Sequence, residues 1–254
     1  EIYDGPRYRE IRRWQLESRP DAWCPVIGTA CGGRVARATS LDDVAGRVVR
    51  VLQLEPVSAC NLRCPACPAT RIGAREPSYA PDRLGILPLP VMLDVVDQLP
   101  GLEKLLFYNF GEPFLHPHLL DMLAEHQDCY FQVFTNGHFI TDETARALRR
   151  LGNVTPLISI EGTEIVSDQR RGRSGVYSKS MQGLQMALRH KLITGVCTSL
   201  CQTNIDDLLQ ESWVDRLIEM GVMYLWYHVY RPVGPDPQPG LALTPAQQLA
   251  ARRF

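Results

Sequence analysis

The sequence has no long apolar segment and no excess of charge of either sign. None of its hydrophobic runs approaches the roughly 18 to 20 residues that a membrane-spanning helix needs, so we expect no membrane segment. Lys and Arg number 27, Asp and Glu number 28, and the formal net charge is −1. This balance gives no electrostatic reason to expect nucleic acid or an anionic membrane as a partner.

A secretory signal is also absent from the first twenty residues, which are charged and lack an apolar stretch. We therefore expect a cytoplasmic protein. A content of 45% hydrophobic and 22% charged residues over 254 residues is typical of a folded globular chain and excludes disorder as the main state.

From residue 48 onward, short apolar runs typical of strands, the first of them rich in β-branched residues, alternate with segments of helical periodicity. We expect helices over 90–99, 118–127, 141–151, 178–190 and 206–220, with Thr141 as an N-cap. The predicted strands are 48–54, 102–110, 130–134, 157–162, 195–200 and 223–230.

Six strand–helix repeats with short turns indicate a parallel sheet covered by helices. We expect an α/β fold, a partial (β/α)6 TIM-like barrel with parallel strands, with a doubly wound open sheet as the alternative. The expected divisions are an N-terminal extension (1–45), the barrel (46–231), and a linker with the start of a truncated C-terminal segment (232–254). In either fold, ligands bind at the C-terminal ends of the strands.

Three of the eight cysteines form a C-x3-C-x2-C arrangement just after the first strand, namely Cys60, Cys64 and Cys67. Three thiolates on one tight loop can each hold a different iron of a four-iron cluster, which leaves the fourth iron open. A zinc site of three cysteines completed by a distant His is the alternative. Buried free thiols are the default reading of Cys24, Cys31, Cys197 and Cys201, and packing is expected for Cys129.

With these cysteines, three further motifs resemble the radical S-adenosylmethionine (radical SAM) superfamily over residues 48–231. Phe110-Gly111-Glu112-Pro113 is similar to its Gly-Gly-Glu-Pro motif, with Phe110 in place of the first Gly. Thr135-Asn136-Gly137 and Ser159-Ile160-Glu161-Gly162 end the third and fourth strands, the latter like Ser-Ile-Asp-Gly. A second departure is Ala66, where the family usually has a large apolar residue against the adenine.

The resemblance implies a [4Fe-4S] cluster on Cys60, Cys64 and Cys67, and reductive cleavage of SAM to a radical that abstracts hydrogen from substrate. It implies that Glu112 receives the amino group of SAM. An arginine after the fourth strand could pair with the SAM carboxylate, and Arg170 is preferred to Arg171. Together the candidates for SAM binding are Gly111, Glu112, Pro113, Asn136, Ser159, Glu161 and Arg170.

No side chain is assigned to the chemical step itself, and His228 and Tyr230 are weaker candidates that face inward near adenine or substrate. The segment from Phe110 to Pro117 is similar to that of family members that modify peptides or proteins and carry a SPASM or twitch extension. We expect an unidentified peptide or small-molecule substrate, as in natural-product or cofactor biosynthesis, and an electron donor such as flavodoxin or ferredoxin. The alternative is a non-catalytic iron–sulfur or zinc protein with a sensor or structural role.

Overall fold

The computed structural model describes residues 49–70, 85–232 and 237–254. Internal contacts divide the chain into residues 1–47 and a second unit of residues 48–254. The expected N-terminal extension, with Cys24 and Cys31, lies outside the described residues. Among the described helices, none is long and apolar enough to cross a membrane.

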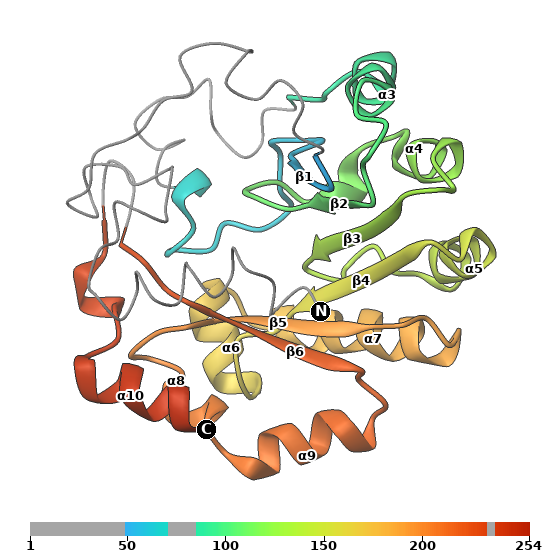
Figure 1. Ribbon diagram of the computed structural model, residues 1–254. Coiled ribbons are helices and arrows are strands. Elements are labelled where there is room, and N and C mark those ends of the chain that lie inside the picture. The colour runs from blue at the N-terminus through green and yellow to red at the C-terminus, as the bar shows by residue number, and fades with distance from the viewer. Residues whose placement is uncertain (1–48, 71–84, 233–236) are drawn as a thin grey trace, which may run out of the picture. The chain divides into compact units, whose positions relative to one another are not determined.

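Six parallel strands form one sheet, and their order in the sheet is their order in the chain. The strands are β1 (Val51–Leu54), β2 (Lys104–Phe107), β3 (Tyr130–Thr135), β4 (Val154–Ser159), β5 (Gly195–Leu200) and β6 (Tyr224–Val229). A doubly wound sheet reverses its strand order at a switch point. The sequential order therefore confirms the partial TIM-like barrel, a curled half-barrel that Figure 1 shows from β1 at one edge to β6 at the other.

Helices follow most of the strands, as right-handed crossovers between parallel neighbours require. They are α3 (Leu89–Asp97), α4 (Leu119–Glu125), α5 (Asp142–Leu151), α6 (Glu164–Arg171), α7 (Val176–Arg189), α8 (Ile205–Leu208), α9 (Glu211–Glu219) and α10 (Pro245–Arg253). Two short 3-10 helices, η6 (Pro113–Leu115) and η7 (Pro239–Leu241), complete the described elements.

The main hydrophobic core lies between the outer face of the sheet and the helices that cover it. Phe107 and Phe131 from neighbouring strands are fully buried there, with their ring centroids 5.7 Å apart. Met92 of α3, Met122 of α4 and Leu184 of α7 belong to the same core. Because this core is on the outside of the half-barrel, the inner face is left for a smaller cluster and a cavity.

Two helical segments differ from the sequence expectation. Residues 164–171, where the sequence predicts no helix, form α6, which ends at Gly172 in the left-handed conformation, with φ 69°. The helix expected over 206–220 is two helices, α8 and α9, because the backbone turns out of the helical conformation at Leu209. The predicted cap is confirmed, since the Thr144 amide donates to Thr141 Oγ1 at 3.2 Å.

Close packing of α7 against the turn after β3 generates a stability prediction. A Cβ atom at Gly183 would lie 2.1 Å from the carbonyl oxygen of Gly137. We expect Gly183→Ala to lower the free energy of unfolding by about 1–3 kcal/mol, the usual cost of overpacking. Denaturant unfolding measures it. Gly240→Ala, where an added Cβ meets nothing within 4 Å, is the control. Equal stability of the two variants would contradict the tight contact.

Candidate functional site

A cavity of about 780 Å³ opens at the C-terminal ends of the strands. All three cysteines of the C-x3-C-x2-C loop line it, together with neighbours in the same loop and with residues from Tyr108 onward that lie forty or more positions later in the chain. The predicted residues Gly111, Glu112, Asn136, Ser159, Glu161 and Arg170 line it as well. The half-barrel therefore brings together residues from the ends of several strands, as parallel sheets do.

The cysteine loop follows β1 and is shaped by short hydrogen bonds of its own. The Cys67 amide donates to the Cys64 carbonyl at 3.0 Å, and the Leu62 amide donates to Cys60 Sγ at 3.4 Å. Burial raises the pKa of Cys60 to about 11 and also raises that of Cys67. A metal must therefore displace protons from these thiols when it binds.

A single metal ion does not find a compact set of ligands here. Among the described residues, no group of three or more His, Cys, Asp or Glu side chains could hold one ion. A cluster of several irons makes a different demand, because each thiolate binds its own iron. The three cysteines on one loop suit the second kind of site.

Glu112 is a buried carboxylate that joins the ends of two strands. It is 2% exposed, and its Oε1 accepts hydrogen bonds from Thr135 Oγ1 at 2.6 Å and from the Phe114 amide at 3.3 Å. Its Oε2 accepts from the Asn136 amide at 2.8 Å. Burial raises the pKa of Glu112 to about 7, although these hydrogen bonds lower it. The carboxylate thus holds the turn after β3 as well as facing the cavity.

The loop that carries Gly111 and Glu112 is fastened to the segment before Cys60. Glu55, directly after β1, accepts hydrogen bonds from the amides of Phe110 and Gly111, both at 3.1 Å. The Glu112 amide donates to the Ala59 carbonyl at 2.8 Å. A Cβ at Gly111 would lie 1.7 Å from the Val57 carbonyl oxygen, so this glycine allows the chain's own backbone to approach.

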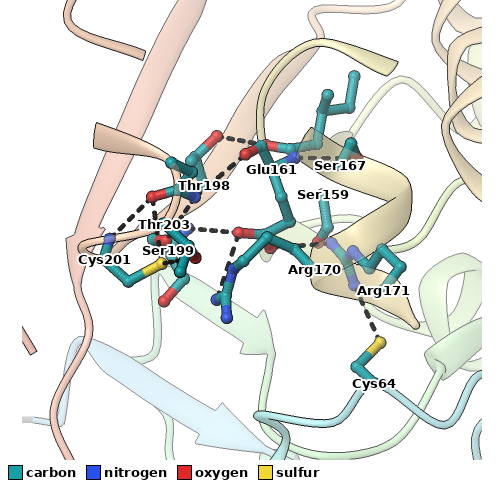
Figure 2. Close-up of polar contacts among 12 residues, drawn as sticks. Cys64, Ser159, Glu161, Ser167, Arg170, Arg171, Thr198, Ser199, Cys201 and Thr203 are labelled. Carbon is teal, nitrogen blue, oxygen red and sulfur yellow. Dashed lines mark hydrogen bonds and ion pairs between the residues drawn. The ribbon is translucent and has the colours of Figure 1, made fainter. Parts of the chain in front are cut away.

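Figure 2 shows a buried ion-pair network in which α6 faces the ends of β4 and β5. Arg171 Nη2 donates to Glu161 Oε1 at 3.0 Å, and Arg170 Nη2 lies 3.8 Å from Glu161 Oε2. The Ser199 amide also donates to Glu161 Oε2, at 3.2 Å. Burial opposes the charge of Arg171, but Glu161 and Cys64 outweigh it and raise the pKa of Arg171 further. The Nε atoms of both arginines are buried and have no partner.

Aromatic rings fill the inner face of the half-barrel below the cavity. His228 of β6 stacks on Trp226, with centroids 5.2 Å apart, and on Tyr108 from the far side, at 5.6 Å. Desolvation lowers the pKa of His228, and its Nε2 is buried without a partner. Ser159 Oγ lies 3.2 Å from the Sγ of Cys197, whose pKa burial raises to about 12. This wall holds a neutral imidazole and a protonated thiol near neutral pH.

The remaining predicted residues occupy several places. Pro113 is buried and begins η6, and Tyr230 lines the cavity beyond β6. Cys201 bonds to Asn204 and Thr203 in the turn after β5, whereas Cys197 faces the inner wall. Cys129 is 3% exposed and belongs to the outer core, as expected.

The sequence did not predict the site contacts of three residues. Glu55 stands directly after a strand, a position that could have marked it. Arg171 was ranked below Arg170, yet it makes the shorter contact with Glu161. Thr135 was noted only as part of a turn motif, but its hydroxyl donates to Glu112.

Comparison with known proteins gives a family match over most of the barrel. The family model described as the Radical SAM superfamily matches residues 54–212. The sporulation killing factor maturation protein SkfB of Bacillus subtilis is 30% identical over 158 residues, which cover 61% of this chain and 37% of SkfB. A tungsten-containing aldehyde ferredoxin oxidoreductase cofactor-modifying protein of Pyrococcus furiosus is 32% identical over 109 residues, covering 41% of this chain and 28% of that protein.

Solved structures share the fold at low identity. SuiB of Streptococcus suis bound to S-adenosylmethionine superposes with a TM-score of 0.65 at 14% identity, covering 96% of this chain and 56% of SuiB. SuiB bound to its precursor peptide SuiA gives a TM-score of 0.57 at 17% identity, covering 71% of this chain and 39% of that one. The chain thus spans less than two fifths of the two curated relatives' lengths and little more than half of SuiB.

The raised pKa of Glu112 predicts a dependence of stability on pH. The folded state holds the proton more tightly than the unfolded state, whose Glu has a pKa near 4.5. This stabilisation is therefore full below about pH 4.5 and is lost as the pH rises through 7. Relative to Glu112→Gln, the unfolding free energy of the metal-free protein should fall by up to about 3 kcal/mol across this range.

Denaturant unfolding at a series of pH values, under reducing conditions, measures this difference. Glu125→Gln, at an exposed position on α4, is the control and should keep the wild-type slope. Parallel pH profiles of the wild type and Glu112→Gln would contradict the prediction.

Proposed function

The chain belongs to the Radical SAM superfamily, and we propose that it is an enzyme that binds a [4Fe-4S] cluster and SAM and abstracts hydrogen from a peptide substrate. The observation that carries this proposal is the shared cavity, in which Cys60, Cys64 and Cys67 meet Glu112 and the buried arginines. These residues come from the ends of different strands. Their meeting therefore depends on the fold and not on closeness in sequence.

The cysteine loop fits an iron–sulfur cluster by its donor set. Three thiols line one wall of the cavity and are not arranged for a single ion. If each thiolate binds one iron of a cubic cluster, one iron keeps no protein ligand and stays accessible to a bound molecule. Cys60, Cys64 and Cys67 are the residues that would hold the cluster.

The rest of the cavity fits a ligand that carries an amino group and a carboxylate. Glu112 is an acceptor for an ammonium group, and the unpartnered Arg170 Nε is a donor for a carboxylate. Charge-assisted hydrogen bonds of this kind are about twice as strong as neutral ones. Ser159 and Asn136 add neutral polar groups to the cavity lining. A cavity of about 780 Å³ is within the usual range for cofactor sites.

When bound, the cluster and SAM supply the reductive cleavage that yields a hydrogen-abstracting radical. The chain's own residues do the remaining work. Glu55 and Glu112 fix the loop ends that border the cavity. The stacked rings of Tyr108, Trp226 and His228 form an apolar inner wall, which reduces the contact of that side with water.

A peptide is the proposed substrate because SkfB is named as a maturation protein and SuiB has been solved with its precursor peptide. An electron donor such as flavodoxin or ferredoxin is part of the proposal, since reduction needs an external electron. A cytoplasmic location is also part of the proposal. The described cysteines form no disulfide, and a reducing compartment would keep their thiols reduced.

Removing the three cysteines tests the cluster. After anaerobic reconstitution, we expect the wild type to bind about four irons per chain and to show broad visible absorption that oxygen bleaches. The triple variant Cys60→Ala, Cys64→Ala, Cys67→Ala should lose both, while Cys129→Ala, in the outer core, should keep both. Iron and sulfide assays decide this. Zinc retained after reconstitution would overturn the assignment.

Turnover separates an enzyme from a non-catalytic iron–sulfur protein. The reconstituted wild type with SAM and dithionite, without oxygen, should release methionine and 5′-deoxyadenosine in equal amounts. Glu112→Gln should keep its iron, since Glu112 is no ligand, but bind SAM about ten- to a hundredfold more weakly. Product analysis and SAM titration measure the two effects. A protein that binds a full cluster but cleaves no SAM would contradict the proposed activity and support the alternative of a non-catalytic iron–sulfur protein.

A further inference from the structure

We propose that Arg171 sets the reduction potential of the iron–sulfur cluster by donating a charged hydrogen bond to the Sγ of Cys64. This inference rests on the proposed function, because it presupposes a cluster on Cys60, Cys64 and Cys67. It gives Arg171 a role of its own, because the sequence analysis names Arg171 only as the less favoured candidate for the SAM carboxylate.

The contact runs from the last residue of α6 to the middle cysteine of the loop. Arg171 Nη1 lies 3.7 Å from Cys64 Sγ, a normal length for a hydrogen bond to sulfur, and Figure 2 shows it as the link between α6 and Cys64. Among the described residues, Arg171 is the one cationic side chain within hydrogen-bonding distance of a sulfur of this loop.

Two further contacts hold the guanidinium in this direction. Its Nη2 donates to Glu161 Oε1 at 3.0 Å, so the planar fork is bound at both nitrogens. The next residue, Gly172, packs against the same loop, because a Cβ there would lie 2.8 Å from Pro65 Cδ. Arg171 thus contacts Cys64 and the next residue, Gly172, packs against Pro65, the residue after Cys64. With both pairs in contact, Arg171 has little freedom to move away from Cys64.

Burial makes this contact effective. The side chain of Arg171 is only 13% exposed, so its charge is weakly screened. Hydrogen bonds to cluster sulfurs and nearby positive charge both favour the reduced state, which carries one more negative charge. Arg171 therefore raises the reduction potential and makes it easier for a donor to deliver the electron.

The neighbouring arginine provides a natural comparison. Arg170 is on the same helix and its side chain is 10% exposed, but it pairs with Glu161 at 3.8 Å, and no hydrogen bond to a cysteine is found for it among the described residues. The two arginines divide the work. Arg171 contacts Cys64, and Arg170, which makes only the longer contact with Glu161, is left to pair with a bound carboxylate.

The test is a redox titration of reconstituted Arg171→Gln, Arg171→Lys and Arg170→Gln without SAM. Dithionite supplies one electron to each oxidised cluster, and the visible absorption and electron paramagnetic resonance signal report the reduced fraction. At the wild-type midpoint, Arg171→Gln should lower the ratio of reduced to oxidised cluster about tenfold, which is 59 mV for a one-electron couple.

Arg171→Lys should give a smaller decrease because it keeps the charge and loses the fork. Arg170→Gln removes the same charge from the same helix and should change the ratio less than threefold. An unchanged midpoint in Arg171→Gln, or an equal decrease in Arg170→Gln, overturns the inference.

Iron content is measured for every variant before the titration. If Arg171→Gln fails to load iron, Arg171→Lys decides, and an unchanged midpoint there overturns the inference. A wild type that binds no cluster overturns the proposed function instead, so the two failures are distinguishable.

Discussion

The parallel pairing of six strands in chain order is the constraint on which the site depends. Each crossover returns the chain to the same end of the sheet, and all crossovers of one hand put the helices on one face. The segments after β1, β2, β3, β4 and β5 therefore meet at the C-terminal end of the sheet. The inner face carries the stacked rings and the polar groups that border the cavity.

Three carboxylates at this end of the sheet bind the loops to one another. Glu55 after β1 holds the amides of the loop after β2, and Glu112 in that loop holds the Asn136 amide after β3. Glu161 after β4 holds the Ser199 amide at the end of β5. A buried carboxylate is costly unless its oxygens accept several hydrogen bonds, and backbone amides at strand ends need acceptors. Each contact meets both needs, and the loops keep their positions without long packing interfaces.

Much of this site could be predicted from the sequence because its residues stand in short local patterns. The cysteine spacing and the motifs at Glu112, Asn136 and Glu161 each follow a segment predicted as a strand, so their place at strand ends could be inferred. The register of the sheet could not, and register decides which residues meet. Arg170 and Arg171 are adjacent in sequence, and only the direction of α6 determines which of them contacts Cys64.

The helix boundaries show the same limit. The run Asp168 to Arg173 is polar, and such composition is typical of loops, but its first four residues form the end of α6. Asp168 also accepts hydrogen bonds from the amides of Gly175 and Tyr177, so it fixes the turn into α7. Side-chain contacts of this kind, seven and nine residues along the chain, outweigh the local propensity of the run.

Glu161 links the cluster side of the cavity to the barrel wall. It pairs with Arg171, which contacts Cys64, and it also binds Ser199 of β5. The charges of Glu161, Arg170 and Arg171 sum to one positive charge in a buried region. An uncompensated buried charge is unfavourable, so the network gains when an anion enters. The proposed cluster on the three thiolates would supply negative charge on one side, and the carboxylate of the proposed ligand would supply it on the other. The one excess positive charge attracts either anion, but once one anion has neutralised it the attraction for the other is weaker, so the two occupants share a single compensating charge.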